Sequence, residues 1–139
     1  DRKRLGQIVF ADEEKRTQLN QIIHPYVIGE LFARAKHDLD AVPNGIAVFE
    51  VPLLFESGLH TQMDHNIVVS CAQESRIRRV MERDNLTREQ VLARMQAQMP
   101  EEEKLLLADS ILFNNGSEDD LLAQVDALYV TLKAGGARV

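Results

Sequence analysis

The run Ile67-Val68-Val69-Ser70-Cys71 decides the fold class, because it is short, apolar and rich in β-branched residues. Two similar runs, 46–51 and 111–113, stand before and after it. Short apolar runs separated by helical patterns are typical of parallel strands that are buried on both faces of a sheet. We therefore predict an α/β fold with three parallel strands.

Apolar residues at helical spacing precede the first of these runs. They predict helices over residues 2–11, 12–23 and 25–41, with Asp12 as the N-cap of the second. Pro25 is expected to end the second helix and to occupy the first turn of the third.

Two arginine-rich helices are predicted between the second and third strands. Thr87 opens the second of them, because Thr-Arg-Glu-Gln over 87–90 is a capping box. After the third strand, residues 114–116 form a turn, and Ser117 can cap a last helix.

The composition is that of an ordinary globular protein. Of the 139 residues, 45% are hydrophobic and 27% charged, which excludes a disordered chain and a disulfide scaffold. No apolar run reaches the roughly 20 residues of a membrane-spanning helix, so we expect no membrane association. The single cysteine, Cys71, predicts a reducing compartment, the cytoplasm. The net charge of −6 gives no indication of nucleic-acid binding.

Positive charge is nevertheless concentrated in one segment. Six of the eleven arginines lie between residues 76 and 94, and Arg76, Arg79 and Arg83 share one helix face. Guanidinium groups favour forked binding of phosphate or carboxylate. For these six arginines as a group, which we call the arginine block, we favour phosphate binding. The alternative is a solvated face paired with Glu74, Glu82, Asp84 and Glu89.

Other residues that could bind a ligand or take part in catalysis give weaker indications. Glu56 follows the first predicted strand, where it is either a ligand-binding group or an exposed loop acid. The four histidines, His24 among them, have no spacing that gathers metal ligands, and His24 before Pro25 is expected at a helix end. Neither Gly-x-Ser-x-Gly nor Gly-x-x-x-x-Gly-Lys-Ser/Thr occurs.

Six stretches in order resemble one family, the dephospho-coenzyme A kinases, over essentially all 139 residues. They are residues 5–12, 23–25, 51–56, 79–84, 94–98 and 108–116. The resemblance implies a P-loop nucleotide-kinase-like fold with a parallel-sheet core. Residues 1–42 would form the helical acceptor-substrate side, 43–71 and 109–139 the α/β core, and 72–108 a helical lid.

The same resemblance implies roles for individual residues. Lid arginines would contact the ATP phosphates: Arg83 and Arg94 first, then Arg76 and Arg79. Asn115 and Gly116 would contact the adenine, and His24 and Glu56 would lie on the acceptor side. The implied reaction moves the γ-phosphoryl of ATP to the ribose 3′-hydroxyl of dephospho-coenzyme A, with Mg²⁺.

The sequence departs from the family pattern at its start. The family's first strand, its phosphate loop with the magnesium-holding Ser/Thr, and its early catalytic aspartate are expected upstream of Asp1. The missing strand would lie between the runs 46–51 and 67–71. We therefore expect the 139 residues alone to lack kinase activity. Two alternatives remain: another nucleotide or nucleoside kinase of this fold, or a non-enzymatic adaptor that binds an acidic partner through its arginines.

Overall fold

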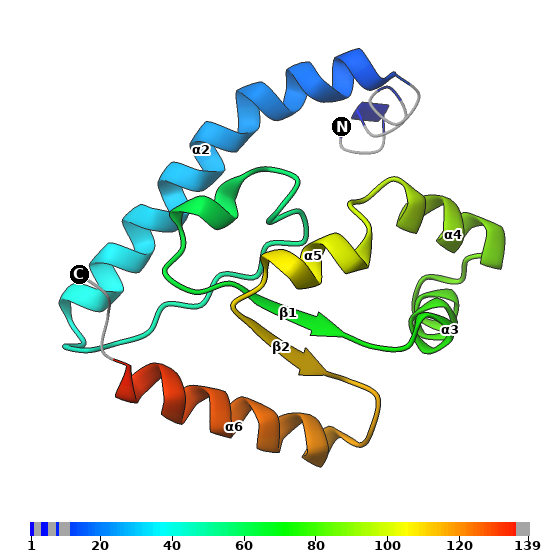
Figure 1. Cartoon of the computed structure of the whole chain (residues 1–139). Helices are drawn as coiled ribbons and strands as arrows, with labels where there is room; N and C mark the ends of the chain where they lie inside the picture. The colour runs from blue at the N-terminus through cyan, green and yellow to red at the C-terminus, as the bar shows by residue number, and fades with distance from the viewer. Residues whose placement is uncertain (2–3, 6–7, 9–11, 136–139) are drawn as a thin grey trace. The chain divides into compact units, whose positions relative to one another are not determined.

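Two short strands form the sheet in the computed structural model of the chain (Figure 1). β1 (Ile67–Ser70) and β2 (Ser110–Phe113) are parallel, with Ile67 opposite Ser110 and Ser70 opposite Phe113. The structure describes residues 1, 4–5, 8 and 12–135, which fall into two units, residues 1–50 and 51–139. The predicted α/β class and two of its three strands are confirmed.

The first predicted strand, residues 46–51, is not formed. Among the described residues the sheet contains β1 and β2 alone, and 46–51 has no regular secondary structure. A strand needs a neighbour that pairs with its backbone N–H and C=O groups, and an apolar β-branched run does not supply one. No described segment pairs with 46–51, so it is not a strand.

The helix of the first unit is longer than predicted. α2 (Glu13–Asp40) is continuous, with Pro25 inside it, so the predicted break at Pro25 is wrong. Proline removes one backbone hydrogen bond, and 28 helical residues tolerate that loss because both sides keep helical periodicity. The predicted Asp12 cap is confirmed, since its carboxylate accepts from the Lys15 N–H at 3.1 Å. Of the predicted 2–11 helix, only residues 4–5 and 8 are helical and described; the rest lies outside the described residues.

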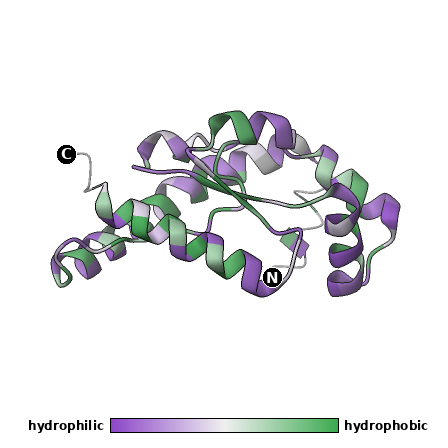
Figure 2. Ribbon diagram, turned by 60° about the horizontal axis from the view of Figure 1, so that its bottom comes forward, coloured by the Kyte–Doolittle hydropathy of each residue, from purple (hydrophilic) through white to green (hydrophobic). Residues whose placement is uncertain are grey.

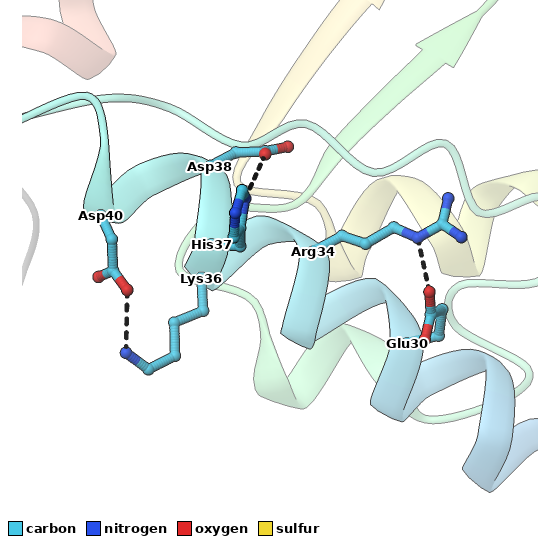
Figure 3. Close-up of polar contacts among 6 residues, drawn as sticks. All are labelled: Glu30, Arg34, Lys36, His37, Asp38 and Asp40. Carbon is cyan, nitrogen blue, oxygen red and sulfur yellow. Dashed lines mark hydrogen bonds and ion pairs between the residues drawn. The ribbon is translucent and has the colours of Figure 1, made fainter.

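Ion pairs between successive turns support the second half of α2. Arg34 Nε lies 2.7 Å from Glu30 Oε1, and Lys36 Nζ lies 3.3 Å from Asp40 Oδ2 (Figure 3). Both pairs join residues i and i+4, the spacing at which side chains of a helix meet. The helix ends at its C-cap, Ala41, and a turn follows, with Asn44 at φ 58°.

Two helices after β1 pack on each other around a small apolar centre. α3 (Gln73–Asp84) buries Ile77 and α4 (Arg88–Gln96) buries Val91, each only 1% exposed. Hydrophilic residues dominate α3 (Figure 2). The predicted capping box of α4 is present, because Thr87 accepts from the Gln90 backbone and Gln90 accepts from the Thr87 backbone.

A further helix, α5 (Glu101–Leu107), was not predicted. It begins after Pro100, and its first turn carries three glutamates, which suit the positive end of a helix dipole. α6 (Glu118–Ala134) follows β2 and contacts that strand. The predicted Ser117 cap is confirmed and is a capping box with Asp120. A Cβ at Gly116 would collide with the Asp120 carboxylate, so this glycine protects the cap.

Residues 51–66, which precede β1 in the second unit, bury two apolar side chains. Phe55 and Leu59 are buried, and Leu59 begins a 3-10 helix, η1 (Leu59–Gln62). Glu56 faces α5: its Oε1 accepts from the Met99 N–H at 2.9 Å and lies 2.8 Å from Lys104 Nζ. The two charged side chains are 22% and 17% exposed, so the pair is largely shielded from water.

Polar contacts also fix the amino ends of the two strands. Asp109 Oδ2 accepts from the Asn66 N–H at 2.7 Å, and His65 Nε2 lies 2.8 Å from Ser110 Oγ. These contacts set the start of β1 against the start of β2. No described helix is long and apolar enough to cross a membrane.

We predict that Val91→Ala destabilises the α3–α4 pair by about 2–3 kcal/mol, because it removes two buried methyl groups and leaves a cavity. Val130→Ala is the matched control, since Val130 is 66% exposed on a helix of the same unit. Alanine favours helix equally at both sites, so the difference between the variants reports burial. Amide hydrogen exchange of α3 and α4 measures this difference in stability. Equal protection in both variants would contradict the packing described.

Glu56 should make stability depend on pH in the acid range. Burial raises the pKa of Glu56, but Lys104 and the Met99 N–H outweigh it and hold the pKa below the ordinary 4.5. A lowered carboxyl pKa stabilises the fold above the unfolded-state value, and the gain is lost as pH falls through the folded-state value. Glu56→Gln should therefore cost about 1–3 kcal/mol at pH 7 and progressively less below pH 4.5.

Urea unfolding at a series of pH values measures this difference. Glu102→Gln, which removes an exposed charge from the same helix as Lys104, is the control and should change little at any pH. A Glu56→Gln effect of constant size from pH 7 to pH 3 would show that the ion pair with Lys104 is not its cause.

Candidate anion-binding site

Charged side chains meet at the carboxyl end of β1. Ser70 Oγ donates to Glu101 Oε1 at 2.6 Å, and the other oxygen of Glu101 pairs with Arg76 Nη2. Ser70 is buried, and the Arg76 and Glu101 side chains are 33% and 23% exposed. The buried Nε of Arg76 has no hydrogen-bond partner among the described residues. Three elements, β1, α3 and α5, are therefore joined at the edge where α/β proteins bind ligands.

The loop after β2 meets the same edge. Asn115 Oδ1 accepts from the Ala72 N–H at 2.7 Å, so it holds the chain that enters α3. Arg79 Nη1 donates to the Asn114 carbonyl at 3.2 Å. We call the group of Ser70, Arg76, Arg79, Glu101, Asn114 and Asn115 the carboxyl-edge cluster.

A second cluster lies at the other end of α3. Arg83 donates to both oxygens of the Asp84 carboxylate, from Nε at 2.8 Å and from Nη2 at 3.2 Å. Arg94, in the last turn of α4, donates to Asp84 Oδ2 at 3.2 Å. Arg83, Asp84 and Arg94 form what we call the lid-end cluster. Two guanidinium groups from two helices thus converge on one anion.

The remaining ion pair of this region joins the first turns of α3 and α4. Arg88 donates to both oxygens of Glu74, at 2.8 and 2.6 Å. The structure therefore divides the arginine block, with Arg83 and Arg94 together, Arg76 and Arg79 at the sheet edge, and Arg88 on Glu74. Pairing with Glu74 and Asp84, weighed above as the alternative to phosphate binding, is present in the structure.

The ion pairs alter the acidity of their carboxylates. Hydrogen bonds from Arg83 hold the pKa of Asp84 below its ordinary value, and the charge of Arg94 lowers it further. The Arg88 hydrogen bonds likewise lower the pKa of Glu74. Both carboxylates are therefore fully ionised at neutral pH, so each arginine group faces a full negative charge.

The residues predicted for the acceptor side belong to different units. His24 lies in the first unit; because α2 is continuous, it stands inside the helix and not at a helix end as predicted. Glu56 lies in the second unit and is bound to Lys104 and the Met99 N–H. Glu56 lies in a turn and is exposed as a residue, as the loop-acid alternative expects, but its side chain is only 22% exposed because these two partners hold it. The ligand-binding form stays a prediction.

We also searched the described part of the chain for metal-binding clusters and for hollows. No cluster of three or more His, Cys, Asp or Glu that could hold a metal occurs among those residues. A hollow of about 440 Å³ lies in the first unit, between the second half of α2 and residues 45–49. Its lining is mainly apolar, with Arg34 and Asp38 as the charged members.

Sequence reasoning missed Glu101, Ser70 and Lys104 as members of these contacts. Pro100 followed by three glutamates was a usable signal for a helix start and hence for Glu101. Nothing in the sequence indicated that Ser70 or Lys104 would face a glutamate distant along the chain.

Comparison with known proteins identifies relatives of the whole chain. A family model described as "Dephospho-CoA kinase" matches residues 1–120. A dephospho-CoA kinase of Bacillus thuringiensis is 40% identical over 132 residues, which are 92% of this chain and 64% of the relative. One from Thermus thermophilus is 40% identical over 138 residues, 99% of this chain and 66% of the relative. The chain thus spans about two thirds of the length of these curated relatives.

Solved structures agree with the sequence comparison. A crystal structure from Thermus thermophilus has a TM-score of 0.79 at 39% identity and covers 95% of this chain and 67% of its own. A dephospho-CoA kinase from Campylobacter jejuni has a TM-score of 0.67 at 33% identity and covers 97% of this chain and 66% of its own. The likeness in structure follows the whole chain, as the likeness in sequence does, and the chain belongs to the dephospho-CoA kinase family.

Proposed function

We propose that this chain serves the transfer of the ATP γ-phosphoryl group to the ribose 3′-hydroxyl of dephospho-coenzyme A. Relatives with that enzyme's name support the reaction. The observation that carries the proposal is the convergence of Arg83 and Arg94 on one carboxylate. A pair of guanidinium groups that holds a carboxylate has the donors that a phosphoryl group needs.

Arg83 and Arg94 would act on the charge of the transferring phosphoryl group. In phosphoryl transfer, catalysis depends on positioning and on neutralising negative charge that moves between oxygens. The two arginines come from α3 and α4, which share the buried Ile77 and Val91, so their spacing is fixed by packing. A lid built in this way carries its donors as one rigid pair and excludes water when it closes.

Arg76, Arg79, Asn115 and Gly116 would form the nucleotide side at the carboxyl-edge cluster. The Oδ1 atom of Asn115 is engaged by the Ala72 N–H, so an adenine contact through this side chain would use its amide nitrogen. Gly116 follows directly and keeps the loop clear beside the Asp120 cap. Arg79 would orient the phosphates from α3, next to the Asn114 carbonyl that it already contacts.

His24 and Glu56 would contribute on the acceptor side. Glu56 Oε1 accepts from Lys104 and the Met99 N–H, so a contact with dephospho-coenzyme A would use its Oε2. We place the activity in the cytoplasm, as the single cysteine of the sequence indicates.

Magnesium is implied by the family resemblance, and the described residues do not fit it. They bring together no three His, Cys, Asp or Glu side chains, and the 139 residues contain no Gly-x-x-x-x-Gly-Lys-Ser/Thr loop. We therefore assign no magnesium-holding residue in this chain and derive no step through the ion.

We predict that the 139-residue chain alone forms no coenzyme A from ATP and dephospho-coenzyme A in a single-turnover assay. A chimera that adds the third of the Thermus thermophilus relative left unmatched by this chain should form it. The physical reason is that lid arginines neutralise charge but cannot replace the backbone N–H groups of a phosphate loop. Transfer to AMP in place of dephospho-coenzyme A by the chimera would point to another nucleotide kinase.

In the active chimera, Arg83→Ala with Arg94→Ala should lower kcat/KM for ATP by about 10²- to 10³-fold, because donors to the transferring group are lost. Arg78→Ala is the control, since Arg78 is an exposed arginine of the same helix outside both clusters. Steady-state kinetics with varied ATP measures both variants. Unchanged turnover and ATP affinity in the double variant would refute the assignment of the lid arginines.

A further inference from the structure

Asp84 stands at an unfavourable place on its own helix. It is the last residue of α3, where the helix dipole is negative and repels a carboxylate. The turn that follows is fixed: Asn85 caps α3 at φ 52°, and Thr87 caps α4. The helix therefore gains no stability from an acid at this position. The favourable interactions of Asp84 are those with Arg83 and Arg94.

The geometry around Asp84 is that of an occupied anion site. Three guanidinium N–H groups donate to its two oxygens, at 2.8, 3.2 and 3.2 Å. The carboxylate side chain is 27% exposed, while Arg83 and Arg94 are 73% and 61% exposed. The donors can thus be reached from solvent, and their present acceptor is the more shielded partner.

The other ion pair of this region differs in both respects. Glu74 is 71% exposed and pairs with one arginine, Arg88. It joins two helices without gathering a second guanidinium. The convergence of two arginines on one acid is therefore particular to the lid-end cluster among the ion pairs between α3 and α4.

We propose that the Asp84 carboxylate occupies the position that a phosphoryl group of the ligand takes between Arg83 and Arg94, and that the ligand must displace it. This rests on the proposed function, since it assumes that these arginines bind phosphate. Asp84 then sets how tightly the lid binds polyphosphate. It also favours ligands with several charges over those with few, because displacing one full negative charge requires a stronger competing attraction.

The test measures binding of inorganic tripolyphosphate and of orthophosphate to the 139-residue chain by calorimetry at low salt. Asp84→Asn should bind tripolyphosphate about fivefold more tightly than the unmodified chain, because the competing charge is gone while the side-chain shape is kept. Its preference for tripolyphosphate over orthophosphate should fall.

Glu82→Gln is the matched control. Glu82 is exposed on α3, two residues before Asp84, and its substitution removes the same charge from the same helix without freeing a contact of Arg83 or Arg94. General repulsion would strengthen binding equally in both variants, and that result would overturn the proposal. Weaker binding by Asp84→Asn would overturn it too, because it would mean that Asp84 merely positions the arginines.

Two further variants distinguish a failure of the Asp84 proposal from misfolding and from a failure of the proposed function. Asp84→Ser removes the charge with a side chain that can cap a turn, and it should also bind more tightly than Glu82→Gln. Arg83→Ala with Arg94→Ala should abolish the gain seen in Asp84→Asn. If the double variant binds tripolyphosphate as the unmodified chain does, the phosphate-binding role fails. If it loses binding while Asp84→Asn gains none, only the displacement of Asp84 fails.

Discussion

Guanidinium groups that lie close together repel one another unless anions lie among them, and this constraint organises the segment from β1 to α5. Each arginine of the two clusters faces an acceptor, which for three of the four comes from another helix or from the loop after β2, while Arg83 pairs with Asp84 on its own helix. Glu101 takes Arg76, the Asn114 carbonyl takes Arg79, and Asp84 takes both Arg83 and Arg94. Positive charge that would otherwise repel itself thereby joins α3 to its neighbours.

Side-chain contacts at the strand ends explain how two short strands hold a defined register. Four residue pairs form the sheet, and the strand ends are fixed by side chains. Asp109 binds the Asn66 N–H at the amino end, and Asn115 binds the Ala72 N–H beyond the carboxyl end. Because a one-residue slip would break both of these contacts, polar groups at the ends specify what apolar strand residues alone leave open.

Features that depend on neighbouring residues were predictable from the sequence, and features that depend on distant partners were not. Asp12, Ser117 and Thr87 each accept from a backbone N–H three residues later, so local spacing determines these caps. The strand at 46–51 needed a pairing partner, and the passage of α2 through Pro25 depended on the whole helix. For the site, the sequence showed that arginines are concentrated between residues 76 and 94. Their division into two clusters depends on how α3, α4 and α5 pack, which the sequence did not show.

The position of the two clusters limits what each can do for a ligand. Arg76 and Arg83 are seven residues apart, which is about 10 Å along a helix, and different acceptors hold their guanidinium groups, Glu101 and Asp84. The carboxyl-edge cluster is tied to the sheet, whereas the lid-end cluster depends on packing between α3 and α4 alone. A ligand at the sheet edge would therefore meet groups that are tied to the sheet. In the exchange proposed above, Arg83 and Arg94 would give up Asp84 when they gain a phosphoryl group, so their contribution to binding would be the difference between the two contacts.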